Sequence, residues 1–279
     1  MAACGVDHEQ RVDAPLHLPG GRMTPPFMYY GGKTRLAPAI SALIPVRKAY
    51  VEPFAGSAAV LLHREPTTHE VLNDLNGDVW NFWTVLRDQT DELIGSLQMT
   101  PNARDEYLFC RDSSQEGLTA VERARRFFVV ANMAFNASAN GKTGYSFDVY
   151  DKGKVRTFIR KVDERLTNVA GRLSNVELEN VDALKLISRW DDPRTSLYLD
   201  PPYMDSTRVS TGDYATDNGG SDFHEELIDR IRDFKGFVAL SGYDHELYNS
   251  LGWRKVEFPV RSSASGKGRR VECVWVNDK

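Results

Sequence analysis

The stretch AYVEPFAGSAAVLLHR, residues 49–64, decides the fold. Residues 49–54 predict a strand, Ala55-Gly56-Ser57 predicts a turn, and residues 58–64 predict the first turns of a helix. A glycine inside such a turn lets the backbone come close to a ligand. The stretch is therefore expected to join a strand to a helix through a loop that a ligand can reach.

The residues that follow extend this unit. A short strand is predicted at 70–72, it runs into the polar turn 73–77, and helices are predicted over 79–86 and 91–98. This order of elements is typical of the first half of an open α/β sheet of Rossmann type: a strand, a tight turn, a helix, a second strand and an acid.

A long interruption separates this half of the sheet from the next. Residues 87–181 carry helical patterns over 120–131 and 155–173, on either side of the polar stretch 136–150, which suggests a hairpin or loop. We expect this segment to be an inserted, mainly helical domain.

The α/β unit is expected to consist of residues 24–86 and 182–279, with residues 1–23 as a mobile arm because they lack periodicity. In its second part, residues 196–199 form a short apolar strand that prolines stop, since proline lacks a ladder donor and fixes φ. The elements predicted after it are a helix over 223–234, a strand over 236–241, a helix over 245–251 and a closing hairpin of 253–260 with 270–276.

Composition places the chain among ordinary globular proteins. It has 279 residues, of which 41% are hydrophobic and 27% charged, so one or two domains are expected. The sequence contains no run of about 18 uncharged apolar residues and no apolar leader region, which predicts a cytoplasmic protein. Cys4, Cys110 and Cys273 form no C-x-x-C pair, so neither a disulfide framework nor a metal site is expected.

Positive charge is concentrated in two segments of a chain whose net charge is −4. Residues 123–172 hold eleven Lys and Arg against four acids, and residues 253–270 hold six against one. Such segments suit phosphate binding, although solvated faces of an ordinary protein would explain charge alone equally well.

The tetrapeptide Asp200-Pro201-Pro202-Tyr203 follows a predicted strand, where ligands bind in open α/β sheets. An exocyclic amine such as N6 of adenine is a weak nucleophile because its lone pair is delocalised into the ring. The Asp200 carboxylate and the Pro201 carbonyl could accept its two N–H groups, while Tyr203 offers a ring for the base to stack on. A strand-ending turn without chemistry is the alternative, and the tetrapeptide alone does not decide between them.

Two features of the first half of the sheet favour the chemical interpretation. Gly56 allows close approach of a ligand, and Phe54 can pack beside an adenosyl group. Asp74 follows Glu52 by 22 residues, the spacing of the acid that binds ribose hydroxyls in nucleotide-binding units. A helix N-cap is the competing role for Asp74.

The segment Tyr29-Tyr30-Gly31-Gly32-Lys33-Thr34 ends like a phosphate-binding loop. That interpretation fails because the first required glycine falls at Phe27 and no strand precedes the segment. A cationic Lys33 beside an aromatic pair could instead bind a carboxylate and flank an adenine.

Taken together and in this order, these motifs resemble those of the Dam-type (D12 class) adenine-N6 DNA methyltransferases over roughly residues 25–276. The resemblance implies a Rossmann-like catalytic domain that uses S-adenosylmethionine (SAM), and a target recognition domain at 87–181. It assigns the catalytic role to Asp200, Pro201, Pro202 and Tyr203. The residues implied to bind SAM are Tyr29, Tyr30, Gly32, Lys33, Glu52, Phe54, Gly56, Asp74, Asp182 and Asp200.

The same resemblance implies a double-stranded DNA partner, read by a hairpin within 136–150 after the target base leaves the helix. Residues expected to contact DNA are Arg126, Asn136, Lys142, Tyr145, Arg156, Arg160, Arg261, Lys267 and Arg269. For Arg126 a structural role within a helix is the alternative. A monomer is expected, and a partner restriction endonuclease stays open.

The chain departs from the family pattern at Ala58, where a second glycine is usual. A methyl group there would crowd the amino-acid end of the cofactor. Alternatives to adenine in DNA are cytosine N4, adenine in RNA or a protein amide, since each presents a planar NH2 group. A non-catalytic DNA-binding protein of the same fold is the alternative outside enzymes.

Overall fold

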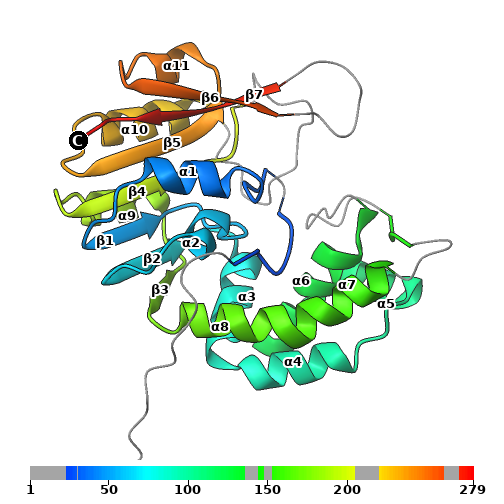
Figure 1. The fold of residues 1–279 in the computed structure, drawn as a ribbon. Coiled ribbons are helices and arrows are strands. Elements are labelled where there is room, and N and C mark those ends of the chain that lie inside the picture. Colours follow the sequence, from blue (N-terminus) through cyan, green and yellow to red (C-terminus); the bar gives the residue numbers. More distant parts are fainter. Residues whose placement is uncertain (1–22, 30, 136–143, 148–152, 205–219, 261–269) are drawn as a thin grey trace, which may run out of the picture.

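The computed structural model describes residues 23–29, 31–135, 144–147, 153–204, 220–260 and 270–279. A sheet flanked by helices occupies one end of the molecule and a group of helices the other (Figure 1). No helix within these described residues is long and apolar enough to cross a membrane.

The sheet has seven strands in the order β3-β2-β1-β4-β5-β7-β6. Its strands are β1 (Ala49–Glu52), β2 (His69–Asn73), β3 (Val176–Glu179), β4 (Thr195–Leu199), β5 (Phe237–Tyr243), β6 (Arg254–Val260) and β7 (Arg270–Val276). The first five are parallel, whereas β7 is antiparallel to both β5 and β6. The Rossmann-like α/β fold predicted from the sequence is confirmed.

The order of the strands reverses between β1 and β4. From β1 the chain moves outward to β2 and β3, and it then returns to pair β4 with the other side of β1. In such a sheet, ligands bind beyond the carboxyl ends of the two strands at the reversal. The fold therefore directs attention to the residues that follow Glu52 and Leu199.

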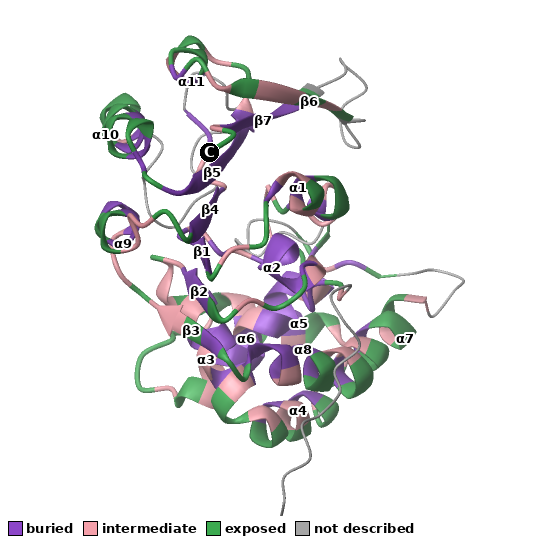
Figure 2. Cartoon of the chain, turned by 60° about the vertical axis from the view of Figure 1, so that its left-hand side comes forward, coloured by how far each residue is buried: buried purple, intermediate pink, exposed green. Residues whose placement is uncertain are grey.

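Apolar residues fill both faces of the sheet because alternate side chains of a strand point to opposite sides. Val51, Leu197 and Val238 face one cluster, and Tyr50 and Tyr198 face the other. Figure 2 shows α9 and α10 on one side of the sheet, with α1 and α2 on the other. The helices of this unit are α1 (Ala37–Leu43), α2 (Ala59–His63), α3 (Gly77–Asp88), α9 (Ala183–Arg189), α10 (Ser221–Arg232) and α11 (Glu246–Asn249).

The helical group shares its core with one face of the sheet. It consists of α4 (Thr90–Gln98), α5 (Arg104–Asp112), α6 (Ala120–Met133), α7 (Gly153–Arg160), the π-helix η2 (Lys161–Arg165) and α8 (Leu166–Leu173). Phe82 and Trp83 of α3 belong to the same buried cluster as Tyr107, Phe128 and Leu166. The helical group is thus joined to the sheet by a continuous apolar core around α3 and α6.

Several elements differ from the sequence-based expectation. Residues 176–179, expected within the inserted segment, pair with β2 as an edge strand whose short, half-polar sequence hides its pattern. The helix expected over 155–173 is interrupted by η2. Helices α1, α5 and α9 were not predicted. The strand expected over 49–54 ends at Glu52, because Pro53 removes the next ladder donor.

Candidate active site

Polar side chains gather on the sheet face that α1 and α2 cover, at the carboxyl ends of the strands. Tyr50 and Glu52 alternate with apolar Val51 along β1, and Asp200 follows Tyr198 in the same alternation after β4. Burial of these positions requires hydrogen bonds, and the Tyr50 hydroxyl donates to Glu52 Oε1 at 2.5 Å. Tyr198 is bonded in turn to the Ser241 hydroxyl of β5, at 3.0 Å.

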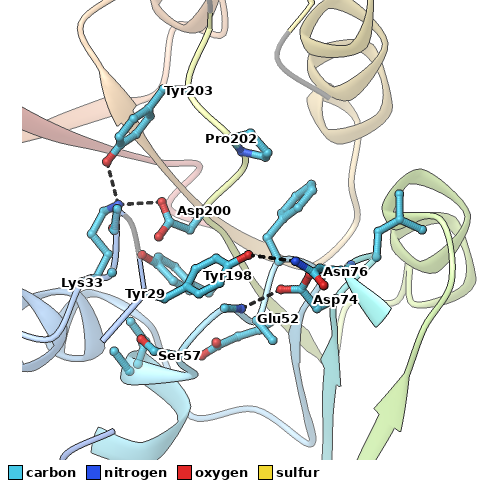
Figure 3. Close-up of a pocket in the computed structure, with 18 residues that line it drawn as sticks. Tyr29, Lys33, Glu52, Ser57, Asp74, Asn76, Tyr198, Asp200, Pro202 and Tyr203 are labelled. Atoms are coloured by element: carbon cyan, nitrogen blue, oxygen red, sulfur yellow. Dashed lines mark hydrogen bonds and ion pairs between the residues drawn. The ribbon is translucent and has the colours of Figure 1, made fainter. Parts of the chain in front are cut away.

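A pocket opens above these strand ends, with about 780 Å³ of unfilled space including the part open to solvent. It brings together most of the predicted site residues, as Figure 3 shows. Those that line it are Tyr29, Gly32, Lys33, Glu52, Phe54, Gly56, Asp74, Asp200, Pro202 and Tyr203. Tyr30 lies outside the described residues.

Lys33 connects the segment before α1 to the residues after β4. Its Nζ donates to Asp200 Oδ1 at 2.7 Å, to the Tyr203 hydroxyl at 2.8 Å and to the Gly31 carbonyl at 2.9 Å. The Lys33 side chain is 5% exposed and that of Asp200 is 19% exposed. The Asp200 carboxylate is thus ion-paired through one oxygen while it still faces the pocket.

The charges of this pair depend on each other. Burial acts to lower the pKa of Lys33, but Asp200 and Glu272 outweigh it and hold that pKa above its usual value. Burial raises the pKa of Asp200, which Lys33 opposes and Glu272 reinforces. Lys33 therefore stays protonated at neutral pH, and its ammonium helps Asp200 to stay ionised.

The loop between β1 and α2 forms the opposite side of the pocket. Gly56 has φ of +46°, a conformation that side chains beyond glycine rarely adopt. Its carbonyl accepts from the indole N–H of Trp83 at 3.0 Å, and its own N–H donates to Asp74 Oδ2 at 2.8 Å. Gly32 packs so closely that an added Cβ would lie 2.9 Å from the Tyr29 carbonyl oxygen.

Asp74 lies at the end of β2 and lines the pocket beside Asn76. Its second oxygen accepts from the Asn76 N–H at 2.9 Å, and Asn76 in turn contacts the Tyr29 hydroxyl at 3.4 Å. Burial raises the pKa of Asp74 to about 6, although the two backbone N–H groups partly counter that rise. The N-cap of α3 is Asn76 and not Asp74, which excludes the competing role.

Glu52 is nearly inaccessible, at 1% exposure, yet it lines the pocket. Burial raises its pKa to about 8, against the hydrogen bond from Tyr50. The group is therefore largely protonated at neutral pH and would ionise readily beside a cationic ligand.

Tyr203 is fixed at both its hydroxyl and its ring. The hydroxyl accepts from Lys33 and donates to Glu272 Oε1 at 2.6 Å. The ring lies 4.5 Å from that of Tyr243, centroid to centroid, and the residue is 9% exposed. A base could stack on Tyr203 only after this side chain or its neighbours move.

Three predicted features lie outside the pocket lining. Asp182 accepts from the Lys185 N–H at 3.0 Å and so caps α9. Pro201 is buried beside the pocket, which Pro202 lines instead. Ala58 does not crowd the pocket: it is fully buried, and it adopts a left-handed conformation with φ of 52° before α2.

Eight of the nine predicted DNA contacts divide into three groups. Arg126 is buried, with bonds to Glu122 and the Ser114 carbonyl and its guanidinium over Phe109, and these contacts fit the structural alternative. The two arginines of α7, Arg156 and Arg160, are exposed. Asn136, Lys142, Arg261, Lys267 and Arg269 lie outside the described residues.

Tyr145 is described and half-buried. Its hydroxyl donates to Asn102 Oδ1 at 3.0 Å, and its ring is parallel to that of Phe147, with Arg104 beside both rings. Phe147 is 58% exposed, so this cluster presents an aromatic ring at the surface.

Sequence reasoning gave no role to the polar residues Ser57, Asn76 and Tyr198, which line the pocket, or to Glu272, which contacts Lys33. Asn76 lies in the polar turn that was predicted at 73–77. The signal for Glu272 is a charged residue within a strand that is apolar after Arg270, two residues before Val274 on the same buried face.

The sheet is mostly parallel, with a pocket at its reversal, a glycine turn on one side of the pocket and an acid after each of two strands. This arrangement defines a Rossmann-like α/β enzyme. A model of the family described as D12 class N6 adenine-specific DNA methyltransferase matches residues 29–258. The chain belongs to this family, and it is therefore an adenine-specific DNA methyltransferase.

Individual relatives agree with the family. The chain is 28% identical to the Type II methyltransferase M1.LlaDCHI of Lactococcus lactis subsp. cremoris, over 88% of this chain and 93% of the relative. It is 25% identical to a DNA adenine methylase of Haemophilus influenzae, over 88% and 90%. It is 26% identical to a DNA N-6-adenine-methyltransferase of Escherichia phage P1, over 87% of this chain and 33% of that longer protein.

Proposed function

We propose that this chain transfers the methyl group of SAM directly to N6 of an adenine that has been turned out of duplex DNA. The observation that carries the proposal is the single pocket in which Asp200, Pro202 and Tyr203 face Gly56 and Asp74 across the reversal of the sheet. The proposed step uses neither a covalent enzyme intermediate nor a metal.

The chemistry of the pocket fits SAM. Asp74 can accept from ribose hydroxyls with the lone pairs that Gly56 and Asn76 leave, and Phe54 and Tyr29 supply aromatic walls for an adenosyl group. Glu52 can take the negative charge that suits the ammonium of the methionine part. When bound, SAM would supply a methyl group on a sulfonium, which is already an activated leaving group.

Asp200 would orient the acceptor. One oxygen is held by Lys33, which leaves the other for an N–H of the adenine amine. The Pro201 carbonyl would accept the second N–H after a local movement, since Pro201 does not line the pocket. Methyl transfer from the sulfonium would leave the nitrogen with a proton to release, and Asp200 would be placed to accept it.

The helical group and residues 136–150 would form the target recognition domain. Arg156 and Arg160 on α7 would neutralise phosphates, and the exposed aromatic ring beside Tyr145 would contact bases. The bacterial and phage sources of the similar proteins support the cytoplasm as the place of action.

The test is Asp200→Ala and Asp200→Asn, assayed on duplex DNA with radiolabelled SAM and by calorimetry for SAM binding. Both variants should lose at least about a thousand-fold in turnover while they still bind SAM. Near-normal turnover in either variant would refute the role of Asp200. Absence of any heat of SAM binding to the native chain would refute the catalytic interpretation of the pocket.

The acceptor is tested by digestion of the treated nucleic acid to nucleosides. N6-methyladenine from duplex DNA is expected, whereas N4-methylcytosine, or methylation of RNA alone, would replace the proposed substrate. For DNA binding, Arg156→Gln and Arg160→Gln should each reduce the slope of log affinity against log salt by about 0.9. An unchanged slope would remove that residue from the DNA surface.

A further inference from the structure

Glu272 on β7 contacts the residues of the proposed active site but does not line the pocket. Its Oε1 accepts from the Tyr203 hydroxyl at 2.6 Å and lies 3.3 Å from Lys33 Nζ. The side chain is 7% exposed. A buried carboxylate of this kind requires partners, and both partners here belong to the proposed chemistry.

The register of the sheet places this carboxylate under Tyr203. Glu272 pairs with Tyr243 across β5 and β7, and the Tyr243 ring packs on the Tyr203 ring at 4.5 Å. The two cross-strand neighbours thus fix Tyr203 together: Tyr243 packs against its ring, and Glu272 accepts from its hydroxyl. A shift of β7 by one residue would turn Glu272 to the other face of the sheet.

Lys33 completes a closed arrangement of four groups. Its ammonium contacts Asp200, Tyr203 and Glu272, and Tyr203 contacts Glu272 directly. Lys33 therefore contacts both Asp200 and Glu272, and Tyr203, which lines the pocket, contacts both Lys33 and Glu272. A change at Glu272 can reach Asp200 through these side chains and through the loss of its negative charge, since that charge raises the pKa of Asp200.

We infer that Glu272 is a positioning residue for methyl transfer, which fixes the orientation of Tyr203 and holds the Lys33 ammonium against Asp200. The inference rests on the proposed function. It extends the acceptor site from the tetrapeptide after β4 to the closing hairpin of the sheet. Catalysis by Asp200 then depends on the register of β7.

Replacement of Glu272 should alter turnover more than binding. Glu272→Gln keeps the shape and an acceptor for Tyr203 but removes the charge, and we expect kcat to fall about ten-fold to a hundred-fold. The dissociation constant for SAM should change less than about three-fold, because Glu272 does not line the pocket. Glu257→Gln is the matched control, since Glu257 is on the same hairpin, 55% exposed and paired only with Lys255 in the contacts described.

A second readout separates positioning from support of the fold. Glu272 raises the pKa of Asp200, so its neutralisation should move the acidic limb of the pH profile of kcat/KM to lower pH. The charged and titratable groups that act on or are acted on by Asp200 are Lys33, Glu52, Tyr198, Tyr203, Tyr248 and Glu272. Only Glu272 changes in the variant, whereas a merely destabilised protein would keep the limb in place.

A double-mutant cycle tests the route. If Glu272 acts through the Tyr203 hydroxyl, Tyr203→Phe combined with Glu272→Ala should be no slower than the slower single variant. Fully additive losses would show that Glu272 does not act through Tyr203 and would overturn that part of the inference. Glu272→Gln takes the place of Glu272→Ala in the cycle if the alanine variant does not fold.

The outcomes distinguish the inference from the proposed function. A native chain that forms no N6-methyladenine would refute the proposed function itself. A native chain that does so, with Glu272→Gln as active as Glu257→Gln or with an unmoved acidic limb, would leave the function standing and refute the role of Glu272.

Discussion

Lys33→Met should destabilise the folded protein because it leaves two carboxylates without their shared cation. Asp200 and Glu272 lie 2.7 Å and 3.3 Å from Lys33 Nζ, with side chains 19% and 7% exposed. Removal of one partner from a buried ion pair costs about 3–5 kcal/mol, and the partial exposure of Asp200 favours about 3 kcal/mol. The loss is expected in the free energy of unfolding measured with urea at pH 8.

The loss should also depend on pH. Lys33 lowers the pKa of Asp200, so its removal raises that pKa further above the value in the unfolded chain. When the pKa of a carboxyl group is higher in the folded protein than in the unfolded chain, the folded protein loses stability as pH rises, because the group ionises first in the unfolded chain. The difference between variant and native protein should therefore shrink from pH 8 to pH 5, by about 1 kcal/mol or more.

Lys235→Met provides the control for this prediction. Lys235 is 63% exposed and pairs with Asp191 at 3.2 Å, so its loss should change the free energy of unfolding by less than about 1 kcal/mol. Equal losses for Lys33→Met and Lys235→Met would contradict the reasoning. So would a loss for Lys33→Met that is the same at pH 5 and pH 8.

Three further changes test the loops of the pocket. Asp74→Asn should weaken SAM binding about ten-fold to a hundred-fold in calorimetry. The native protein should also lose affinity for SAM below about pH 6, where Asp74 becomes protonated, and this loss should be absent from the variant. Gly32→Ala should lower the free energy of unfolding by about 1–3 kcal/mol because its Cβ would meet the Tyr29 carbonyl at 2.9 Å, while Gly95→Ala, in open space on α4, should leave it unchanged or raise it. Ala58→Gly should raise the melting temperature if the left-handed backbone strains alanine, and a lower one would refute that.

The sheet was predictable because its strands combine short apolar runs with strong turn signals. Residues 49–52 and 195–199 are buried throughout, and the proline after each strand fixes where it ends. The edge strand at 176–179 was missed because only its first residue is fully buried, so neither alternation nor a continuous apolar run marks it.

The site was predictable where chemistry and spacing coincide, as at Asp200, Gly56 and Asp74. The contact between Lys33 and Asp200 joins residues 167 positions apart, and no local pattern indicates it. Arg126 could have been assigned to structure, since Glu122 precedes it by four residues on the same helix. Glu272 required the register of the hairpin, which apolar alternation in β6 and β7 does not fix to a single residue.

The apolar core that runs from the sheet into α3 and α6 limits how residues 87–175 can be exchanged in order to change the DNA sequence that the enzyme would recognise. A chimaera that exchanged residues 87–175 as a block with those of a relative would cut between Phe82 and Phe128, whose rings stack at 5.9 Å. Such a hybrid would need matched packing on both sides of the cut. If the helical group reads the DNA target, as proposed, a new target specificity is more accessible through surface positions of α7 than through exchange of the whole block.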